Sequence, residues 1–517
     1  MDKDNIEEYL KYYKEILKMS PEDYDNFEKS IQSPLPYTFR IVETEYKKVI
    51  EEKMNEKFAG FYFPFSHFKN TFCFYKPSQL GDEQNESFGE FFEFVVTLTN
   101  AGLMQRQEIV SMIPVFFLDV KKDSLVYEPC AAPGSKTKQI LELLDGSGIL
   151  VANEIKKKRM NILVNEANKR PNVNFMITRL DASIFPRPNE NFTRICCDVP
   201  CTGDGTIRKN SDVTTNWSTE EGPRQVKLQS KILQRSLEML SEDGILVYST
   251  CSLNPIENEF VVNSVALSKG EFELFLPEEL FEETFTYDRL NTDKFIVRKG
   301  ITEFNYKSKK REFSFDNPDL EKCIRIYPHD NNTGGFFIAV IRRKTERKLQ
   351  KKEIQQKANS KGFFDVPADI SEKLVSFDFK MVSYSIKYNS IFAVSHQLYD
   401  FILNNPKLRL SMAGMKAYEK DINLENKEAK ERFYRGKTSY MTKFNFQADA
   451  VMNIKQFLMF EAGKSVEKSE LGDFNITGYF TVNLEGTKEK FCGFASNKKV
   501  LLYIPNKITK FLRILYE

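Results

Sequence analysis

Two cysteines stand in loops that contain proline and that follow short apolar segments. Cys201 lies in Asp198-Val199-Pro200-Cys201-Thr202-Gly203, and Cys251 lies in Ser249-Thr250-Cys251-Ser252-Leu253-Asn254-Pro255. A single cysteine is most often a small buried hydrophobic residue. A thiolate is also a strong nucleophile, so a pair of thiols could form a covalent intermediate and then resolve it. The pair predicts covalent catalysis if the fold brings the two loops together.

Strands and helices are expected to alternate between about residues 120 and 343. Strands are predicted at 124–127, 148–152, 173–178, 193–197, 244–250 and 334–341, with helices at 139–144, 156–169 and 226–240. This alternation is typical of an α/β fold with a doubly wound sheet. Because parallel strands end at the same edge of such a sheet, the loops that carry Cys201 and Cys251 are expected to lie close together.

Polar residues stand at the ends of five predicted strands. They are Glu128, Glu154, Asp181, Asp198 and Cys251. Any one of them could be a capping or loop residue. Together they are typical of a sheet edge that binds a cofactor and carries out chemistry.

A turn of small residues joins the strand at 124–127 to the following helix, with the sequence Cys130-Ala131-Ala132-Pro133-Gly134-Ser135-Lys136-Thr137. It is not a phosphate-binding P-loop, because Ser135 separates Gly134 from Lys136, and it lacks the three glycines of a dinucleotide fingerprint. An S-adenosylmethionine site needs only a tight turn and an acid at the end of the next strand, which Glu154 supplies. An ordinary strand-to-helix turn remains the alternative.

A methyl donor combined with a catalytic thiol indicates methylation of cytosine at carbon 5. That carbon becomes nucleophilic enough only after a thiolate has added to carbon 6. The addition calls for a proton or hydrogen bond at ring nitrogen 3, which Asp198 could provide if its pKa were raised. A second cysteine could assist the later elimination. The target base must be unstacked to reach such a pocket.

Several motifs resemble the NOL/NOP/Sun family of RNA cytosine-5 methyltransferases, and most closely its eukaryotic multisite tRNA-modifying branch. The resemblance runs from about residue 10 to 343 and is weaker beyond. The matching segments are Pro34–Arg40, Arg106–Glu108, Ser111–Pro114, Cys130–Thr137, Asp198–Thr206, Arg208–Asn210, Tyr248–Pro255 and Thr333–Phe337.

The resemblance implies a Rossmann-like methyltransferase with S-adenosylmethionine as cofactor and tRNA as substrate. It implies that Cys251 is the nucleophile, that Cys201 releases the product and that Asp198 takes part in catalysis. Glu128 and Glu154 stand where Asp is commoner in the family, and Thr202 stands where Ser is frequent. The implied cofactor-binding residues are Cys130, Ala131, Ala132, Pro133, Gly134, Ser135, Lys136, Glu154, Asp181 and Asp198.

Four regions are expected along the chain. An N-terminal α+β RNA-binding region covers 1–110, the catalytic domain 111–343, a basic linker 344–362, and a C-terminal α+β RNA-binding domain 363–517. A PUA-like fold is one form that the last domain could take. The basic run could instead be a nuclear-import signal or a nucleic-acid patch.

Local patterns give further expectations. Residues 105–113 predict a short helix that ends near Pro114. Arg40 is interpreted either as a phosphate contact or as a surface strand residue, and Arg208-Lys209 and the basic helix at Lys156–Arg159 are candidates for phosphate contacts or for a solvated charged face.

Composition excludes several classes of protein. The 517 residues carry a net charge of +2, three scattered histidines and eight cysteines without metal-binding spacing, so no metal site is expected. No signal peptide or membrane-spanning run is visible.

A monomer in the nucleus is expected, with the nucleolus or cytoplasm as alternatives. Ribosomal RNA methylation, or an RNA-binding scaffold without activity, are the alternative functions.

Overall fold

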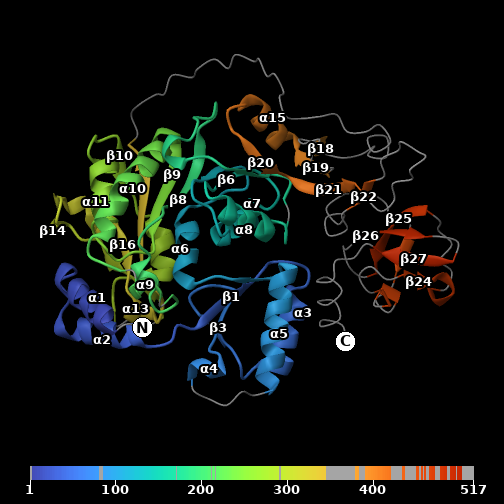
Figure 1. Cartoon of the computed structure of the whole chain (residues 1–517), viewed down its shortest axis with the longest axis horizontal. Coiled ribbons are helices and arrows are strands. Elements are labelled where there is room, and N and C mark those ends of the chain that lie inside the picture. The colour runs from blue at the N-terminus through green and yellow to red at the C-terminus, as the bar shows by residue number, and fades with distance from the viewer. Residues whose placement is uncertain are drawn as a thin grey trace.

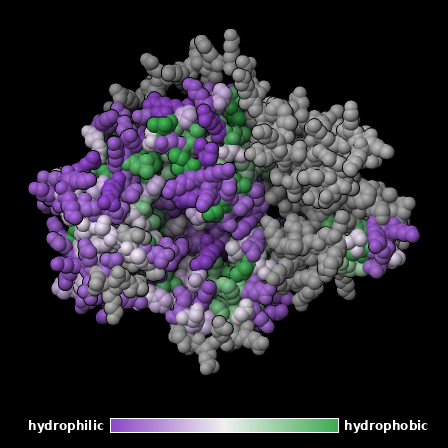
Figure 2. Space-filling model, in the orientation of Figure 1, coloured by the Kyte–Doolittle hydropathy of each residue, from purple (hydrophilic) through white to green (hydrophobic). Residues whose placement is uncertain are grey.

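The computed structural model describes most of the first 344 residues and separate segments beyond them. The described ranges are 3–344 without 81–85, 171, 211, 216 and 290–292, then 379–382, 390–420 and shorter segments between 434 and 502. The predicted basic linker therefore lies almost wholly outside the described residues. Figure 2 shows hydrophilic side chains over most of the described surface on one face, with hydrophobic residues in small separate patches.

A mixed sheet of ten strands, counted over the described residues, forms the centre of the molecule (Figure 1). Its five central strands run parallel, in the spatial order β9-β8-β5-β6-β7. The prediction of a doubly wound α/β sheet is confirmed. The central strands are β5 (Leu125–Glu128), β6 (Ile149–Asn153), β7 (Phe175–Thr178), β8 (Phe192–Asp198) and β9 (Leu240–Thr250).

Antiparallel strands flank this parallel centre on both sides. On one side β17 (Phe336–Arg343) pairs with β9, followed by β16 (Ile324–Ile326) and β13 (Arg298–Lys299), while β10 (Phe272–Leu274) also pairs with β17. On the other side β20 (Leu410–Ala413) pairs with β7. β20 thus belongs to the central sheet, although it falls in the segment assigned from sequence to a separate C-terminal domain.

Helices cover both faces of the sheet because successive strand residues point to opposite faces. Cys196 of β8 packs in the hydrophobic cluster of the first face, while its neighbour Cys197 packs in that of the second. The first face is covered by α6 (Ile109–Phe117), α7 (Ser135–Leu144) and α8 (Lys157–Ala167), and the second by α10 (Glu221–Glu238), with α1 (Lys3–Ile16) and α2 (Pro21–Gln32) in the same cluster.

The order of the parallel strands reverses at β5. The chain runs from β5 through β6 to β7, and then returns to place β8 on the other side of β5. In open α/β sheets ligands bind outside the carboxyl ends of the strands at such a reversal. The crevice beyond Glu128 of β5 and Asp198 of β8 is therefore the expected ligand site.

A smaller antiparallel sheet lies below the central domain in Figure 1, with the order β2-β3-β1-β4. Two helices pack their apolar residues against it. The elements are β1 (Tyr37–Ile41), α3 (Lys47–Phe58), β2 (Phe63–Pro64), β3 (Thr71–Phe74), α4 (Pro77–Leu80), α5 (Glu86–Ala101) and β4 (Met104–Arg106).

The C-terminal part contains further short strands and one described helix of nine residues. Two small sheets have the orders β18-β19-β21-β22 and β23-β25-β26-β27-β24. Their elements include β18 (Phe379–Val382), β19 (Ser390–Ser395), α15 (His396–Asn404), β21 (Met415–Lys420), β22 (Tyr434–Gly436), β23 (Ala450–Met452), β24 (Ser465–Glu467), β25 (Gly478–Leu484), β26 (Lys490–Ala495) and β27 (Lys499–Leu502).

The helix predicted at 105–113 is wrong at both ends. Its first residues form β4, which pairs with β1, and the helix α6 continues through Pro114 to Phe117. Proline inside a helix lacks an N–H donor and normally disfavours the helix. Here most of α6 is buried against the sheet. We attribute its continuation to this apolar packing.

A buried ion pair connects β16 to α11 (Glu259–Val262), the short helix that follows the Cys251 loop. Arg325 is 1% exposed, and its Nε and Nη2 donate to the two carboxylate oxygens of Glu259 at 2.6 and 2.5 Å. Its Nη1 donates to the carbonyl oxygen of Leu253 at 2.8 Å. Removal of one member of such a pair leaves the other charge buried and uncompensated.

Replacement of Arg325 by Met is expected to lower the free energy of unfolding by about 3–5 kcal/mol. Arg342→Met is the control, because Arg342 forms an exposed pair with Glu273, and a change of about 1 kcal/mol or less is expected there. Urea unfolding followed by the fluorescence of Trp217, the single tryptophan of the chain, measures both. Equal losses in the two variants would contradict the role given to Arg325.

Candidate active site

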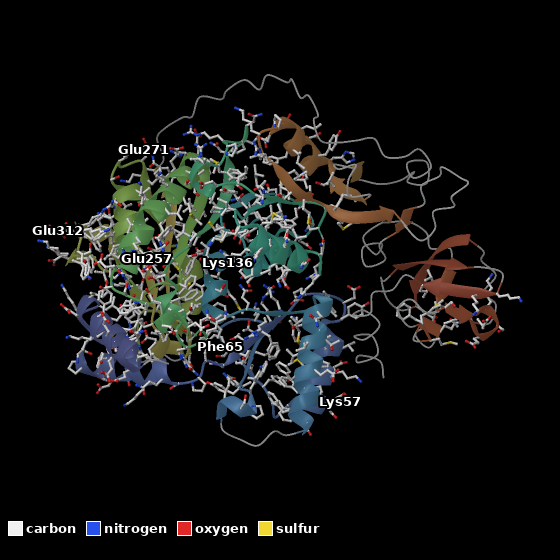
Figure 3. The ribbon with its side chains drawn as sticks, in the orientation of Figure 1. Lys57, Phe65, Lys136, Glu257, Glu271 and Glu312 are labelled. Atoms are coloured by element: carbon white, nitrogen blue, oxygen red, sulfur yellow. The ribbon has the colours of Figure 1, made fainter. Side chains whose placement is uncertain are left out.

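A cavity of about 560 Å³ lies at the carboxyl edge of the central sheet. One wall consists of residues 35–38 and 106–108 of the N-terminal region, and the other comes from the loops after β5, β8 and β9. Figure 3 labels Lys136, which belongs to the first turn of α7 and lies near the middle of the view. The cavity thus opens where the strand order predicts a ligand site.

The cavity brings together only part of the predicted site. Asp181 instead lines a second cavity of about 410 Å³, together with Leu180 and Ile184. Cys130, Gly134, Glu154 and Cys201 line neither cavity. The predicted site residues that do line the larger one are Ala131, Ala132, Pro133, Ser135, Lys136, Asp198 and Cys251.

The turn after β5 is held in place by its neighbours. Gly134 has φ +106°, and a Cβ atom there would lie 2.9 Å from Cδ1 of Leu163, so glycine is needed on both grounds. Asn153 donates from Nδ2 to the carbonyl oxygen of Pro129 at 2.9 Å. Arg159 donates to that of Ala132 at 2.5 Å. The turn is therefore formed before any ligand arrives.

Acidic side chains at the ends of β6 and β7 are fixed by local hydrogen bonds. Glu154 is buried and accepts from the backbone N–H of Lys156 at 2.8 Å, with Arg159 3.5 Å from its other oxygen. Asp181 accepts from the backbone N–H and the hydroxyl of Ser183 at 2.9 and 2.7 Å. Both carboxylates keep lone pairs for hydroxyl or amino groups of a ligand.

Glu128 at the end of β5 is fully buried and accepts a hydrogen bond from the Thr137 hydroxyl at 2.6 Å. Burial raises its pKa to about 8, against the weaker opposing effects of Thr137 and Lys136. Glu128 is thus largely protonated at neutral pH in the ligand-free protein. A cationic group bound beside it would favour loss of that proton.

Lys136 and Asp198 form a half-buried ion pair at the back of the cavity. Lys136 Nζ lies 2.8 Å from Asp198 Oδ2, and the Ser249 hydroxyl donates to Oδ1 at 2.8 Å. Burial acts to lower the pKa of Lys136, but the charge of Asp198 and the hydrogen bond to it, together with smaller contributions from Cys196 and Glu128, raise the net pKa. Both oxygens of Asp198 thus have a hydrogen-bond donor beside them. The hypothesis that Asp198 itself donates a proton stays a prediction.

The two cysteine loops meet at the edge of the cavity. Cys201 Sγ lies 3.4 Å from Cys251 Sγ, and both thiols are free. The backbone N–H of Gly205 donates to the carbonyl oxygen of Cys251 at 2.9 Å. The hydrogen bond with Cys251 and then burial raise the pKa of the Cys201 thiol. The predicted proximity of the two cysteines is confirmed by this geometry, while their catalytic roles stay a prediction.

Sequence reasoning assigned no role to three buried carboxyl groups beside these loops. Glu108 lines the cavity and accepts from the backbone N–H of Gly334 at 2.9 Å. Asp204 and Glu257 lie behind Cys201 and Cys251 and are fully buried. All three lie in or next to the motifs that carry the family resemblance. Those motifs could have pointed to the three acids, whereas no local sequence pattern marks them.

Two of the residues expected to contact phosphate instead bind other residues of the same chain. Arg40 forms an ion pair with Glu142 at 2.5 Å and donates to Gln105, so neither of the two interpretations of Arg40 describes it. Arg208 donates to the carbonyl oxygens of Thr333 and Pro34 at 2.8 and 3.0 Å. Lys209, by contrast, is half-exposed and lines the cavity.

Among the residues that the structure describes, no group of three or more His, Cys, Asp or Glu side chains is arranged to hold a metal ion. Within the same ranges, no helix has the length and apolar character required to cross a membrane.

Known proteins resemble the chain over this part of its length. The family model described as "16S rRNA methyltransferase RsmB/F" matches residues 115–342. A Saccharomyces cerevisiae multisite-specific tRNA (cytosine-C5) methyltransferase is 36% identical over 65% of this chain and 55% of its own length. A Pyrococcus abyssi tRNA (cytosine(49)-C5) methyltransferase is 31% identical over 50% of this chain and 74% of its own length.

A solved structure supports the same relationship. A methyltransferase homologue from Pyrococcus horikoshii is 25% identical, with a TM-score of 0.50, over 66% of this chain and 100% of its own length. The chain spans about half the length of the eukaryotic relatives that it matches. The matched domain, the central sheet and the shared motifs together show that the chain belongs to the NOL/NOP/Sun family of RNA cytosine-5 methyltransferases, which includes the RsmB/F enzymes.

Proposed function

We propose that this chain methylates carbon 5 of cytosine in tRNA, with S-adenosylmethionine as the methyl donor. The observation that carries the proposal is the pair of free thiols 3.4 Å apart, one of which opens onto the cavity that contains Lys136 and Asp198. Two adjacent thiols can supply the nucleophile for addition to a pyrimidine ring and the group that moves protons during release.

The residues at the strand ends fit S-adenosylmethionine, which when bound supplies an activated methyl group on a sulfonium. Glu128 can accept from the cofactor's amino group, and Glu154 can accept from ribose hydroxyls. Asp181 faces a neighbouring cavity where it can accept from the base. The turn at 131–135 can bring the backbone close to the ligand because its side chains are small.

Cys251 is proposed to add to carbon 6 of the cytosine. Its sulfur forms the new bond as the thiol proton is lost, and the ring electrons move towards carbon 5 as nitrogen 3 takes up one proton, which it gives back when the product is released. The Lys136–Asp198 pair supplies a donor and an acceptor for the polar edge of the ring. Carbon 5 then takes the methyl group with its electron pair, and the donor leaves as a neutral thioether.

Cys201 is proposed to resolve the adduct. Loss of the carbon 5 proton re-forms the double bond between carbons 5 and 6 and expels the Cys251 thiolate. With its pKa raised, Cys201 is held as a thiol, so it can give its proton to the departing Cys251 sulfur and take the carbon 5 proton in its place. Its sulfur is already in contact with Cys251, where the bond to carbon 6 breaks.

The names of several relatives support tRNA as the substrate. The yeast, fly and fission yeast relatives are named as tRNA cytosine-C5 methyltransferases. A ribosomal RNA small subunit methyltransferase F from Aeromonas salmonicida is 38% identical over 47% of this chain, so ribosomal RNA is the second candidate. Lys209 and Arg106 on the cavity wall are available for phosphate contacts, which position RNA without specifying its sequence.

Two further proposals concern the location of the protein in the cell and its oligomeric state. The cationic run that starts at Arg342-Arg343-Lys344 supports a location in the nucleus, and we propose a monomer. A fluorescent fusion and sedimentation velocity would measure these two properties. A cytoplasmic fusion or a concentration-dependent dimer would contradict them.

The variant Cys201→Ala is expected to form a stable protein–RNA adduct with tRNA and S-adenosylmethionine, because Cys251 can add but the product is released slowly. Denaturing gels with labelled RNA measure the adduct. Cys323→Ala is the control, because Cys323 is buried in the core and its loss should trap no RNA.

The double variant Cys201→Ala/Cys251→Ala should form no adduct. An adduct with ribosomal RNA alone would leave the chemistry intact and change the substrate. If no RNA is trapped and wild-type protein transfers no methyl group, the scaffold function replaces catalysis.

Binding of S-adenosylmethionine is expected to tighten between pH 6 and 7.5. The pKa of Glu128 is raised to about 8, so the carboxylate fraction that can bind the amino group grows with pH in this window. Titration calorimetry should show Kd falling by up to about tenfold per pH unit, the limit for one linked proton. Glu128→Gln should bind more weakly and lose the pH dependence. An unchanged slope in this variant would assign the linked proton to another group.

A further inference from the structure

A ring of four oxygen atoms joins the residues that directly follow the two cysteines. The Thr202 hydroxyl lies 2.6 Å from Asp204 Oδ2 and 2.5 Å from Glu257 Oε1. The Ser252 hydroxyl lies 2.9 Å from the same Asp204 oxygen and 2.8 Å from the same Glu257 oxygen. Each carboxyl group therefore touches both cysteine loops.

The remaining oxygens of the two acids are bound elsewhere. Glu257 Oε2 accepts from the backbone N–H of Thr202 at 3.0 Å and from Gln229 Nε2 at 2.8 Å. Asp204 Oδ1 accepts from the backbone N–H of Leu253 at 2.7 Å. The other two carboxyl oxygens lie against the two hydroxyl groups, and the Tyr13 hydroxyl beside Asp204 acts to lower the pKa of that acid, against the larger effect of burial.

Counting protons shows that both acids cannot be ionised in this geometry. Each hydroxyl can donate only one hydrogen bond, so the hydroxyls of Thr202 and Ser252 account for two of the four short contacts, and a single proton on either carboxyl group accounts for a third. With Asp204 and Glu257 both ionised, two contacts would set oxygen lone pairs against each other at less than 3 Å. At least one carboxyl group must therefore donate.

The surroundings favour the protonated form. Burial raises the pKa of both carboxyl groups, and the charge of Asp204 helps to raise that of Glu257 to about 7. No lysine or arginine in the described ranges forms a salt bridge with either acid. The titratable groups that face the pair are uncharged at neutral pH: Tyr9, Tyr12, Tyr13, Cys201 and Tyr248.

We propose that Asp204 and Glu257 share a proton and act as positioning residues that hold the Cys201 loop against the Cys251 loop. Neither acid lines the cavity, and each acts through Thr202 and Ser252 on the neighbouring thiols. Figure 3 shows Glu257 away from Lys136, in the part of the chain next to α10 and α11. The inference rests on the proposed covalent mechanism and adds that product release depends on this shared proton.

The test compares Thr202→Val with Thr202→Ser. Valine keeps the size of threonine but removes the hydroxyl, while serine keeps the hydroxyl, so serine should restore what valine loses. In single-turnover assays with tRNA, we expect Thr202→Val to transfer the methyl group at nearly the wild-type rate. It should release the adduct at least about tenfold more slowly, with both cysteines present. Thr202→Ser should release it like wild type.

Glu257→Gln tests directly whether Glu257 is protonated. The glutamine amide always carries an N–H donor, in the place where a protonated carboxyl group would carry an O–H donor. It should melt at or above the wild-type temperature and release product normally, whereas Glu257→Ala should accumulate the adduct. Equal rates of adduct release by Thr202→Val and Thr202→Ser would overturn the proposal. A Glu257→Gln variant that melts below the wild-type temperature and accumulates the adduct would also overturn it. Wild-type protein that neither transfers methyl groups nor forms an adduct would instead overturn the proposed function.

Discussion

Strands β8 and β9 pair in parallel with Asp198 opposite Ser249, and the position of the reactive groups follows from that register. Because the strands end at the same level, the chain leaves both of them at the same edge. Cys201 follows β8 by three residues and Cys251 follows β9 directly. Two short turns are then enough to bring the thiols to 3.4 Å. A shift of one residue would turn the side chains of one strand to the opposite face.

The loops beyond that edge are held by polar contacts in addition to the apolar packing of residues such as Leu253 and Ile256. Asp204 and Glu257 connect them from behind, and Arg325 connects the second loop to β16 through Glu259 and Leu253. Buried polar groups are costly unless they are satisfied. Where they are satisfied they fix one geometry, which suits thiols that must stay in contact.

Much of this arrangement could be predicted from the sequence. Strands at 193–197 and 244–250 are visible as apolar runs, and the rule that parallel strands end together predicts the meeting of Cys201 and Cys251. The tight turn at Gly134 is visible because small residues lie between a strand and a helix. These features depend on local composition and on one general property of α/β sheets.

Other features depend on partners that are far away in the sequence. Arg40 pairs with Glu142, 102 residues further along, so its local strand pattern could not reveal an internal ion pair. The ring through Asp204 and Glu257 needs the two loops to be docked before its oxygens meet. The strand β20 joins β7 from beyond residue 400. Helix α6 passes Pro114 because burial of its other residues outweighs a local preference.

The most direct measurement is the identity of the cysteine that bonds to the base. Wild-type protein would react with S-adenosylmethionine and tRNA that contains 5-fluorocytidine, where fluorine blocks the loss from carbon 5 and so traps the adduct. Peptide mass spectrometry would then locate the bond. If Cys251 is the nucleophile, the nucleotide will be found on the peptide that contains Cys251, and Cys201 will be unmodified. A nucleotide on Cys201, or no adduct while ordinary tRNA is methylated, would contradict the central claim.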